Sequence, residues 1–472
     1  MLNFNLCFET GQVPKELKLA KVIPIHKKGP SDVFSNYRPI SLLPLFSKIF
    51  EKCMYVRLQS HLDKHEILYK KQFGFRAKHS TSHALLDFLL NSSKAIENKE
   101  IIVGIFLDFK KAFDSINHEI LLDKLHFYGI RGVTHDLFRN YLLDREQFTA
   151  FSEHDSLHEK VTCGVPQGSI LGPLLFLIFI NDLANISSIM NILLFADDTN
   201  LFFKHDNVEW LAKTINTELC KVSNWISANK LQLNYDKTHM MVFNSCKRDT
   251  SKLNIFIDGH AVKTVKTTKF LGVSIDDDLK WKAHVNEILL KISKTIGVMS
   301  KLKHCLPKSI LLSIYNSLIL PYLSYNTIIW GACSKYLMER INLLQKRAVR
   351  IISKTPYDSH TKPLFHELNI LPVSLLYDYQ VICFMHSYVN NMLPETFDNL
   401  FVQNKSIHTY NTRSANDFRV PYGRTSFTNS NFICKAPELW NMLPTNIKQC
   451  SAVKGFKSKL KKHLLQNFIS ND

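Results

Sequence analysis

The chain has 472 residues, and its 59 Lys and Arg against 41 Asp and Glu give a net charge of +18. Hydrophobic residues at 45% and charged residues at 21% exclude a disordered, collagen-like or low-complexity protein, and the length predicts two or three domains. The sequence pI of about 9.3 indicates a polyanionic partner. Nucleic acid is the first candidate, and an anionic membrane surface is the weaker one.

Cysteine usage and apolar runs restrict the class of protein further. The ten cysteines form no C-x-x-C or Cys/His cluster, so they are expected to be isolated reduced thiols and not zinc ligands. The longest apolar run, at 170–180, has 11 residues and contains a glycine and a proline, whereas a membrane span needs about 20. We therefore expect a buried helix here and an intracellular protein, nuclear or cytoplasmic, without membrane association.

In chain order, the first structural signals lie in the only acidic stretch, residues 101–200, where the net charge is −6. IIVGIFLDF at 101–109 is an apolar, β-branched run, and the NHEILLDKLHFYGI segment after it has apolar residues at helical spacing, which predicts a strand and then a helix. ILLFADDTNLFF at 192–203 has two apolar arms around a polar centre at 197–200, which is typical of a tight β-hairpin.

After about residue 280 the pattern becomes helical. In the segment 334–354 apolar residues recur at spacings of four and three, while Arg340, Arg347 and Lys354 repeat every seven residues on another face. The segment 454–465 repeats this design with lysines around an apolar stripe. Both segments predict helices with one core face and one basic face.

Three carboxylates are the strongest chemical signal. Asp108 ends the first strand and Asp197 and Asp198 lie at the hairpin, so adjacent strands would place them together. Clustered carboxylates repel each other, and hard divalent cations such as magnesium remove that repulsion. Two such ions clamp the attacking and leaving oxygens of a nucleotidyl transfer. The alternative is that paired aspartates simply suit a turn.

Seven motifs in order sharpen this interpretation. They are NYRPISLLP at 36–44, QFGFRAKHST at 72–81, LDFKKAFDSINH at 107–118, GVPQGSILGPLLF at 164–176, FADD at 195–198, LNYDKTHMM at 233–241 and FLGVSID at 270–276. In this order they resemble the blocks of the reverse transcriptases of non-LTR retrotransposons, most of all the jockey-like elements. NTRSANDF at 411–418 and APELWNMLPTNIK at 436–448 are similar to the region C-terminal to the polymerase in those elements.

The resemblance implies an α/β (α+β) right-hand polymerase with fingers, an antiparallel-sheet palm, a helical thumb and a small helical C-terminal extension. The implied domains are fingers and palm at 1–280, thumb at 281–365 and extension at 366–472. An endonuclease usually precedes the polymerase in such elements, and since residue 1 lies inside the first polymerase block, we expect a chain without it.

The resemblance also implies roles for individual residues. Asp108, Asp197 and Asp198, with the backbone carbonyl of Phe109, would hold two magnesium ions, for which manganese can substitute. Phe113 would lie under the incoming sugar and exclude a 2′-hydroxyl, unless it is only a core residue.

The remaining site residues are expected to bind nucleotide or nucleic acid. Nucleotide contacts are expected from Arg38, Gln167 and Lys237, the last as a donor of a proton to pyrophosphate. Nucleic-acid contacts are expected from Lys27, Lys28, Arg76, Leu271, Gly272, Arg340 and Arg347. A solvated surface charge is the alternative for the cations, and Asp114 is expected to act as a structural residue at the start of a helix.

The function predicted on this basis is RNA-directed DNA polymerase activity, in which a DNA primer 3′-hydroxyl is extended with dNTPs on an RNA template. An RNA-dependent RNA polymerase is an alternative, although Phe113 disfavours it. A catalytically inactive, retroelement-derived relic that only binds RNA is the second alternative.

Overall fold

The structure is a computed structural model that describes residues 4–151, 154–407 and 414–470. The first three residues of NTRSANDF, 411–413, lie outside this described part. The chain divides into two compact units. Unit 1 contains Met1–Ala77, Val103–Met240 and Asp249–Thr264, and unit 2 contains Lys78–Ile102, Met241–Arg248 and Val265–Asp472. This division does not test the predicted domain boundaries at 280 and 365, which stay predictions.

Two sheets lie largely in unit 1. The first has the order β2-β1-β4-β5, with β6 also on β4. Its strands are β1 (Leu19–His26), β2 (Tyr37–Leu42), β4 (Arg145–Phe151), β5 (His154–Asp155) and β6 (Glu159–Val161). The second has the order β12-β9-β3-β8-β7. Its strands are β3 (Ile101–Leu107), β7 (Asn191–Phe195), β8 (Asp198–His205), β9 (His239–Phe243) and β12 (Lys263–Thr264).

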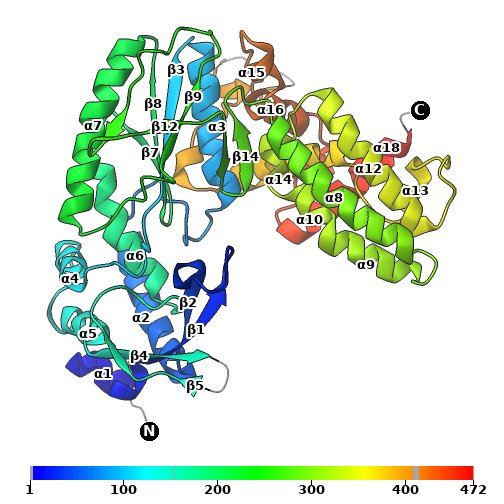
Figure 1. Cartoon of the computed structure of the whole chain (residues 1–472). Helices are drawn as coiled ribbons and strands as arrows, with labels where there is room; N and C mark the ends of the chain where they lie inside the picture. Colours follow the sequence, from blue (N-terminus) through cyan, green and yellow to red (C-terminus); the bar gives the residue numbers. More distant parts are fainter. Residues whose placement is uncertain (1–3, 152–153, 408–413, 471–472) are drawn as a thin grey trace. The chain divides into compact units, whose positions relative to one another are not determined.

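The second sheet carries the predicted strand and hairpin. Every residue of β3 is buried, in agreement with its uninterrupted apolar sequence, and β3 lies beside β8 (Figure 1). The β7–β8 pair is antiparallel, whereas the short β12 runs parallel to β9, so the sheet is mixed and not purely antiparallel. A further small hairpin joins β10 (Phe256–Ile257) and β11 (His260–Ala261).

Helices make up much of the rest of unit 1. They are α1 (Phe4–Thr10), α2 (Leu45–Lys64), α4 (His118–Phe127), α5 (Gly132–Leu142), α6 (Gly172–Ile180) and α7 (Val208–Ala228). The apolar run at 170–180 forms α6, in which every residue except Pro173 is buried, so the prediction of a core helix is confirmed. Within the described residues, no helix is both long and apolar enough to cross a membrane.

Unit 2 is mainly helical. It contains α3 (Thr81–Glu97), the hairpin strands β13 (Thr267–Phe270) and β14 (Val273–Asp276), and the helices α8 (Lys282–Leu302), α9 (Lys308–Leu318), α10 (Leu320–Ser324), α11 (Thr327–Trp330), α12 (Lys335–Ser353), α13 (Lys362–Glu367), α14 (Val373–Val389), α15 (Ser426–Ser430), α16 (Phe432–Asn441), α17 (Thr445–Lys448) and α18 (Val453–Ser470). The basic helices expected at 334–354 and 454–465 are α12 and α18. The α/β fold class predicted from the sequence is therefore confirmed.

The C-terminal extension packs inside unit 2. α14 packs against α16 and α18, and α15 against α3. The extension therefore shares one core with α3, which precedes β3 by only a few residues in the chain.

Candidate active site

Asp108 lies directly after β3 and is fixed by the LNYDK segment. Its backbone carbonyl accepts a hydrogen bond from the Asn234 N–H at 2.7 Å, and its N–H donates to Thr238 Oγ1 at 3.4 Å. Its carboxylate accepts bonds from Asn234 Nδ2 at 3.1 Å and from Lys237 Nζ at 3.2 Å. The strand end and the LNYDK loop together orient this carboxylate.

The turn that carries Asp197 is held by a buried glutamine. Phe195 pairs with Asp198, so the turn consists of Ala196 and Asp197, and Ala196 has a left-handed φ of +55°. Gln72, only 2% exposed, accepts hydrogen bonds through Oε1 from the Ala196 N–H at 3.0 Å and from the Gly74 N–H at 2.9 Å. The QFGF motif therefore supports the turn directly.

The hairpin prediction needs one correction. The polar centre 197–200 was expected to form the turn, but β8 already begins at Asp198, and Thr199 and Asn200 are buried within it. The register places the two aspartates on either side of the boundary between turn and strand.

The three carboxylates influence one another. Asp197 and Asp198 reach solvent, but protein atoms crowd their other sides. This desolvation, with repulsion from Asp197 and Asp108, raises the pKa of Asp198 to about 6. Desolvation and Asp108 also raise the pKa of Asp197, while Arg38 and Lys27 oppose that rise. The site thus concentrates negative charge at an energetic cost.

The assignment of the three carboxylates as metal ligands stays a prediction. Within the described residues, no group of three or more His, Cys, Asp or Glu side chains is arranged to hold a metal ion. One physical reason is the engagement of Asp108 with Lys237 and Asn234, which gives its charge protein partners. The donor set still suits a hard divalent cation, since it consists of carboxylates whose mutual repulsion such an ion would relieve.

Cations surround these acids. Arg38 lies on β2 opposite Ile25 of β1, close enough to affect the pKa of Asp197. Burial, followed by the charges of Arg38, Lys237 and Lys28, lowers the pKa of Lys27, while Asp108 opposes this effect. The structure therefore brings Lys27 to the carboxylates, a position that its predicted role as a template contact did not anticipate.

Two phenylalanines follow Asp108 at the expected positions. Phe109 and Leu233 form an isolated antiparallel β-bridge. Its hydrogen bonds run from the Lys110 N–H to the Gln232 carbonyl and from the Asn234 N–H to the Asp108 carbonyl, so the bridge does not use the Phe109 carbonyl. Phe113 is half-buried and stacks on Phe176 with ring centroids 4.5 Å apart. The Phe113 ring is thus fixed from one side by the core helix α6.

Gln167 is joined to Asp114 and not free. Its Nε2 donates to both carboxylate oxygens of Asp114, at 2.9 and 3.1 Å. The expectation that Asp114 opens the following helix is wrong, because Asn117 is the N-cap of α4 and accepts the Ile120 N–H. Asp114 instead orients the amide of Gln167. Burial raises the pKa of Asp114, and the bond from Gln167 opposes this.

Gly164, in the same loop as Gln167, packs closely against the backbone of Asp114. With φ at +82°, a Cβ there would lie 2.6 Å from the Asp114 carbonyl oxygen. A glycine at this position therefore permits a close approach of backbone to backbone.

The other predicted nucleic-acid residues are distributed over both units. In unit 1, Arg76 Nη1 donates to the Tyr69 carbonyl at 2.9 Å, and Lys28 is exposed. In unit 2, Leu271 and Gly272 form the tip of the β13–β14 hairpin.

The two predicted arginines on α12 differ in their surroundings. Arg340 donates to Asn286 Oδ1 at 3.1 Å, whereas Arg347 is exposed. Their contacts with nucleic acid stay predictions.

Gln72 and Asn234 are the site residues that sequence reasoning missed. Both lie inside motifs that the sequence already singled out, QFGFR and LNYDK, and that was the available signal. Their partners are 124 and 126 residues away in the chain, so only the fold could assign their contacts.

Comparison with known proteins decides the family. The family profile described as reverse transcriptase (RNA-dependent DNA polymerase) matches residues 25–275. The chain belongs to the reverse transcriptase family. The match spans β2, β3, β8 and the LNYDK segment, and therefore every carboxylate of the site.

Curated reverse transcriptase relatives come from mobile elements of Drosophila melanogaster. The chain is 30% identical over 387 residues to the RNA-directed DNA polymerase from mobile element jockey, covering 78% of this chain and 41% of the relative. It is 30% identical to the probable RNA-directed DNA polymerase from transposon X-element, covering 79% and 42%. The chain thus spans about two fifths of the length of the curated relatives that it matches.

A solved structure that matches part of this chain is apo telomerase from Candida tropicalis. The identity is 12% and the TM-score 0.45, with 81% of this chain and 67% of that chain covered.

Proposed function

We propose that this chain is the RNA-directed DNA polymerase of a non-LTR retrotransposon and extends a DNA primer with dNTPs on an RNA template. The observation that carries the proposal is the meeting of Asp108 with the Asp197–Asp198 turn at one end of the β3–β8 pair, with Arg38 and Lys27 beside them. Family membership supports the same chemistry. The expected intracellular location remains a prediction.

Metal binding is assigned to the three aspartates and the Phe109 carbonyl. When bound there, two magnesium ions supply charge neutralisation for the attacking 3′-oxygen and the departing pyrophosphate. Lys237 and Asn234 both bond to Oδ2 of Asp108, so its Oδ1 would remain to hold an ion. Lys237, which lies beside this carboxylate, is assigned to donate a proton toward pyrophosphate.

Arg38 and Lys27 are assigned to the triphosphate. They lie on the β1–β2 side of the carboxylates, where they balance charge on the phosphates as pyrophosphate leaves. Phe113, fixed against Phe176, is assigned to exclusion of the 2′-hydroxyl, and Gln167, oriented by Asp114, to contact with the nucleotide.

The test is primer extension on an RNA template with magnesium and dNTPs. We expect D197N/D198N to abolish extension and to leave duplex affinity within about twofold, because phosphate contacts carry most of that affinity. The matched control is D123N/D136N, which removes the same charge from exposed positions on α4 and α5. Extension by D197N/D198N would refute the assignment of the site.

The same assay separates the alternatives. A wild-type chain that binds primer–template in a salt-sensitive way but never extends it would be the RNA-binding relic. Preferential incorporation of NTPs over dNTPs would identify an RNA polymerase and remove the role given to Phe113.

A further inference from the structure

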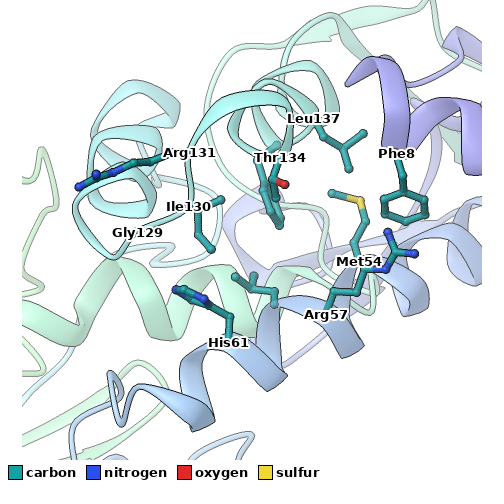
Figure 2. Close-up of a pocket in the computed structure, with 11 residues that line it drawn as sticks. Phe8, Met54, Arg57, His61, Gly129, Ile130, Arg131, Thr134 and Leu137 are labelled. Atoms are coloured by element: carbon teal, nitrogen blue, oxygen red, sulfur yellow. The ribbon is translucent and has the colours of Figure 1, made fainter.

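A cavity in unit 1 lies away from the carboxylates. It has a volume of ≈ 370 Å³ and lies between α1, α2 and the α4–α5 connection (Figure 2). Buried apolar side chains form much of its lining: Met54, Leu58, Ile130, Leu137 and Phe138. Its size is within the range of about 300–1,000 Å³ that is usual for small-ligand pockets. None of its lining residues belongs to the proposed polymerase site.

The ionisable side chains of the lining are basic. They are Arg57, Arg131 and His61, and no carboxylate among the described residues lines the cavity. The Arg57 guanidinium lies over the Phe8 ring at 4.0 Å, which holds the planar cation beside the cavity. Among the described residues, neither Arg57 nor Arg131 has an ion-pair partner. The His61 ring is fixed through Nε2 at 2.9 Å from the Tyr128 carbonyl oxygen.

This combination selects a ligand with two parts. Unpaired guanidinium groups favour an anion, and a buried apolar lining favours a flat, uncharged body. A carboxylate side chain of an acidic peptide would satisfy the cations but leave most of the cavity unfilled. A nucleotide carries a phosphate next to an aromatic base and satisfies both parts, and unpaired RNA bases are commonly received by such surfaces.

We propose that the cavity binds one unpaired nucleotide of single-stranded RNA, with the base against the apolar lining and a phosphate facing Arg57 and Arg131. Arg131 is also the N-cap residue of α5 and makes no side-chain capping bond, so the first amides of that helix add donors for the same phosphate. This inference rests on the proposed function for RNA as the partner and assigns a second contact point for it.

The first experiment locates the base. A single-stranded ten-residue RNA with one photoreactive 4-thiouridine is irradiated with the full chain, and crosslinked peptides are identified by mass spectrometry. We expect crosslinks in α1, α2 or the segment 129–138. A T134W variant fills the cavity from an exposed lining position while keeping both arginines, and should reduce these crosslinks about tenfold. Crosslinks confined to other segments, or unchanged by T134W, would overturn the proposal.

The second experiment tests the phosphate contacts. R57E/R131E should weaken binding of the same RNA at least tenfold and reduce the slope of log affinity against log salt by about one. The matched control is K64E/R139E, which makes the same charge change at exposed positions on the same two helices, outside the cavity. Equal losses in the two double variants would show general electrostatic attraction only and refute the site.

Failure of this inference differs from failure of the proposed function. On a template with a single unpaired nucleotide beyond the primer, R57E/R131E should extend as well as K64E/R139E. Retained extension without the expected crosslinks would remove the cavity's role and leave the polymerase intact. Crosslinks in a wild-type chain that does not extend any primer would leave the RNA site and remove the polymerase.

Discussion

Glu97, the last residue of α3, fastens the C-terminal extension through its carboxylate. Oε2 accepts the Arg424 N–H at 2.9 Å, and Oε1 accepts the Thr425 N–H at 3.0 Å and the Thr425 hydroxyl at 2.9 Å. Thr425 is in turn the N-cap of α15. Hydrogen bonds from Thr428, Thr425 and Arg424 together lower the Glu97 pKa from 4.5 to about 2. The ionised carboxylate is therefore an integral part of the packing of the extension.

We predict that Glu97→Gln destabilises this contact by up to about 3 kcal/mol at pH 7. A pKa lowered from 4.5 to about 2 corresponds to that magnitude at about 1.4 kcal/mol per pH unit. Glutamine keeps the size of the side chain, but its amide nitrogen cannot accept the amide and hydroxyl protons that the second oxygen now accepts.

Hydrogen exchange of the Arg424 and Thr425 amides measures the effect directly. In the variant these amides should exchange up to about 100-fold faster at pH 7. Because the pKa of Glu97 is lower in the folded state, its stabilisation is complete above pH 4.5 and is lost as pH falls toward 2. The difference in stability between wild type and variant should therefore disappear over that pH range. Glu438→Gln, which removes a partly exposed pair with Lys435, is the control. A gap below 0.5 kcal/mol, or one independent of pH, would refute this reasoning.

Three further predictions concern the polymerase site. Gln72→Leu leaves the buried amides of Gly74 and Ala196 without an acceptor, which costs about 1–3 kcal/mol of stability for each amide. The variant should have a lower kcat with little change in duplex affinity. An unchanged kcat in steady-state extension would contradict the role of this residue. Gly164→Ala combines a left-handed φ with a clash against backbone and should destabilise the fold by about 3 kcal/mol or more, measured by urea denaturation. Phe113→Val should reduce the preference for dNTPs over NTPs at least about tenfold in competitive incorporation; an unchanged preference would make this ring a core residue only.

Much of the fold and of the site could be predicted because the relevant signals are local. The uninterrupted apolar sequence of β3 requires burial on both faces, and the apolar run at 172–180 has no polar face to expose, so both are core elements wherever they pack. Seven motifs in order were enough to predict the family and to select Asp108, Asp197 and Asp198.

Other features depended on contacts between distant segments. The tight turn of the β7–β8 hairpin can begin at several positions in FADDTN. One of them is selected by the pairing of Phe195 with Asp198 and by the bond between Gln72 and Ala196. The N-cap of α4 is Asn117, whereas Asp114 is bonded to Gln167, which lies 53 residues away in the chain.

By itself, the sequence determined the family, through seven motifs in order, and also the strand β3, the β7–β8 hairpin and the helical character after about residue 280, because motifs and periodicity act along the chain. Only the tertiary structure decided how those side chains are held. It gave Asp108 partners from the LNYDK loop, brought Lys27 to the carboxylates, and joined the C-terminal extension to α3 through Glu97. Such hydrogen bonds and charge interactions link residues tens to hundreds of positions apart, and no local pattern specifies them.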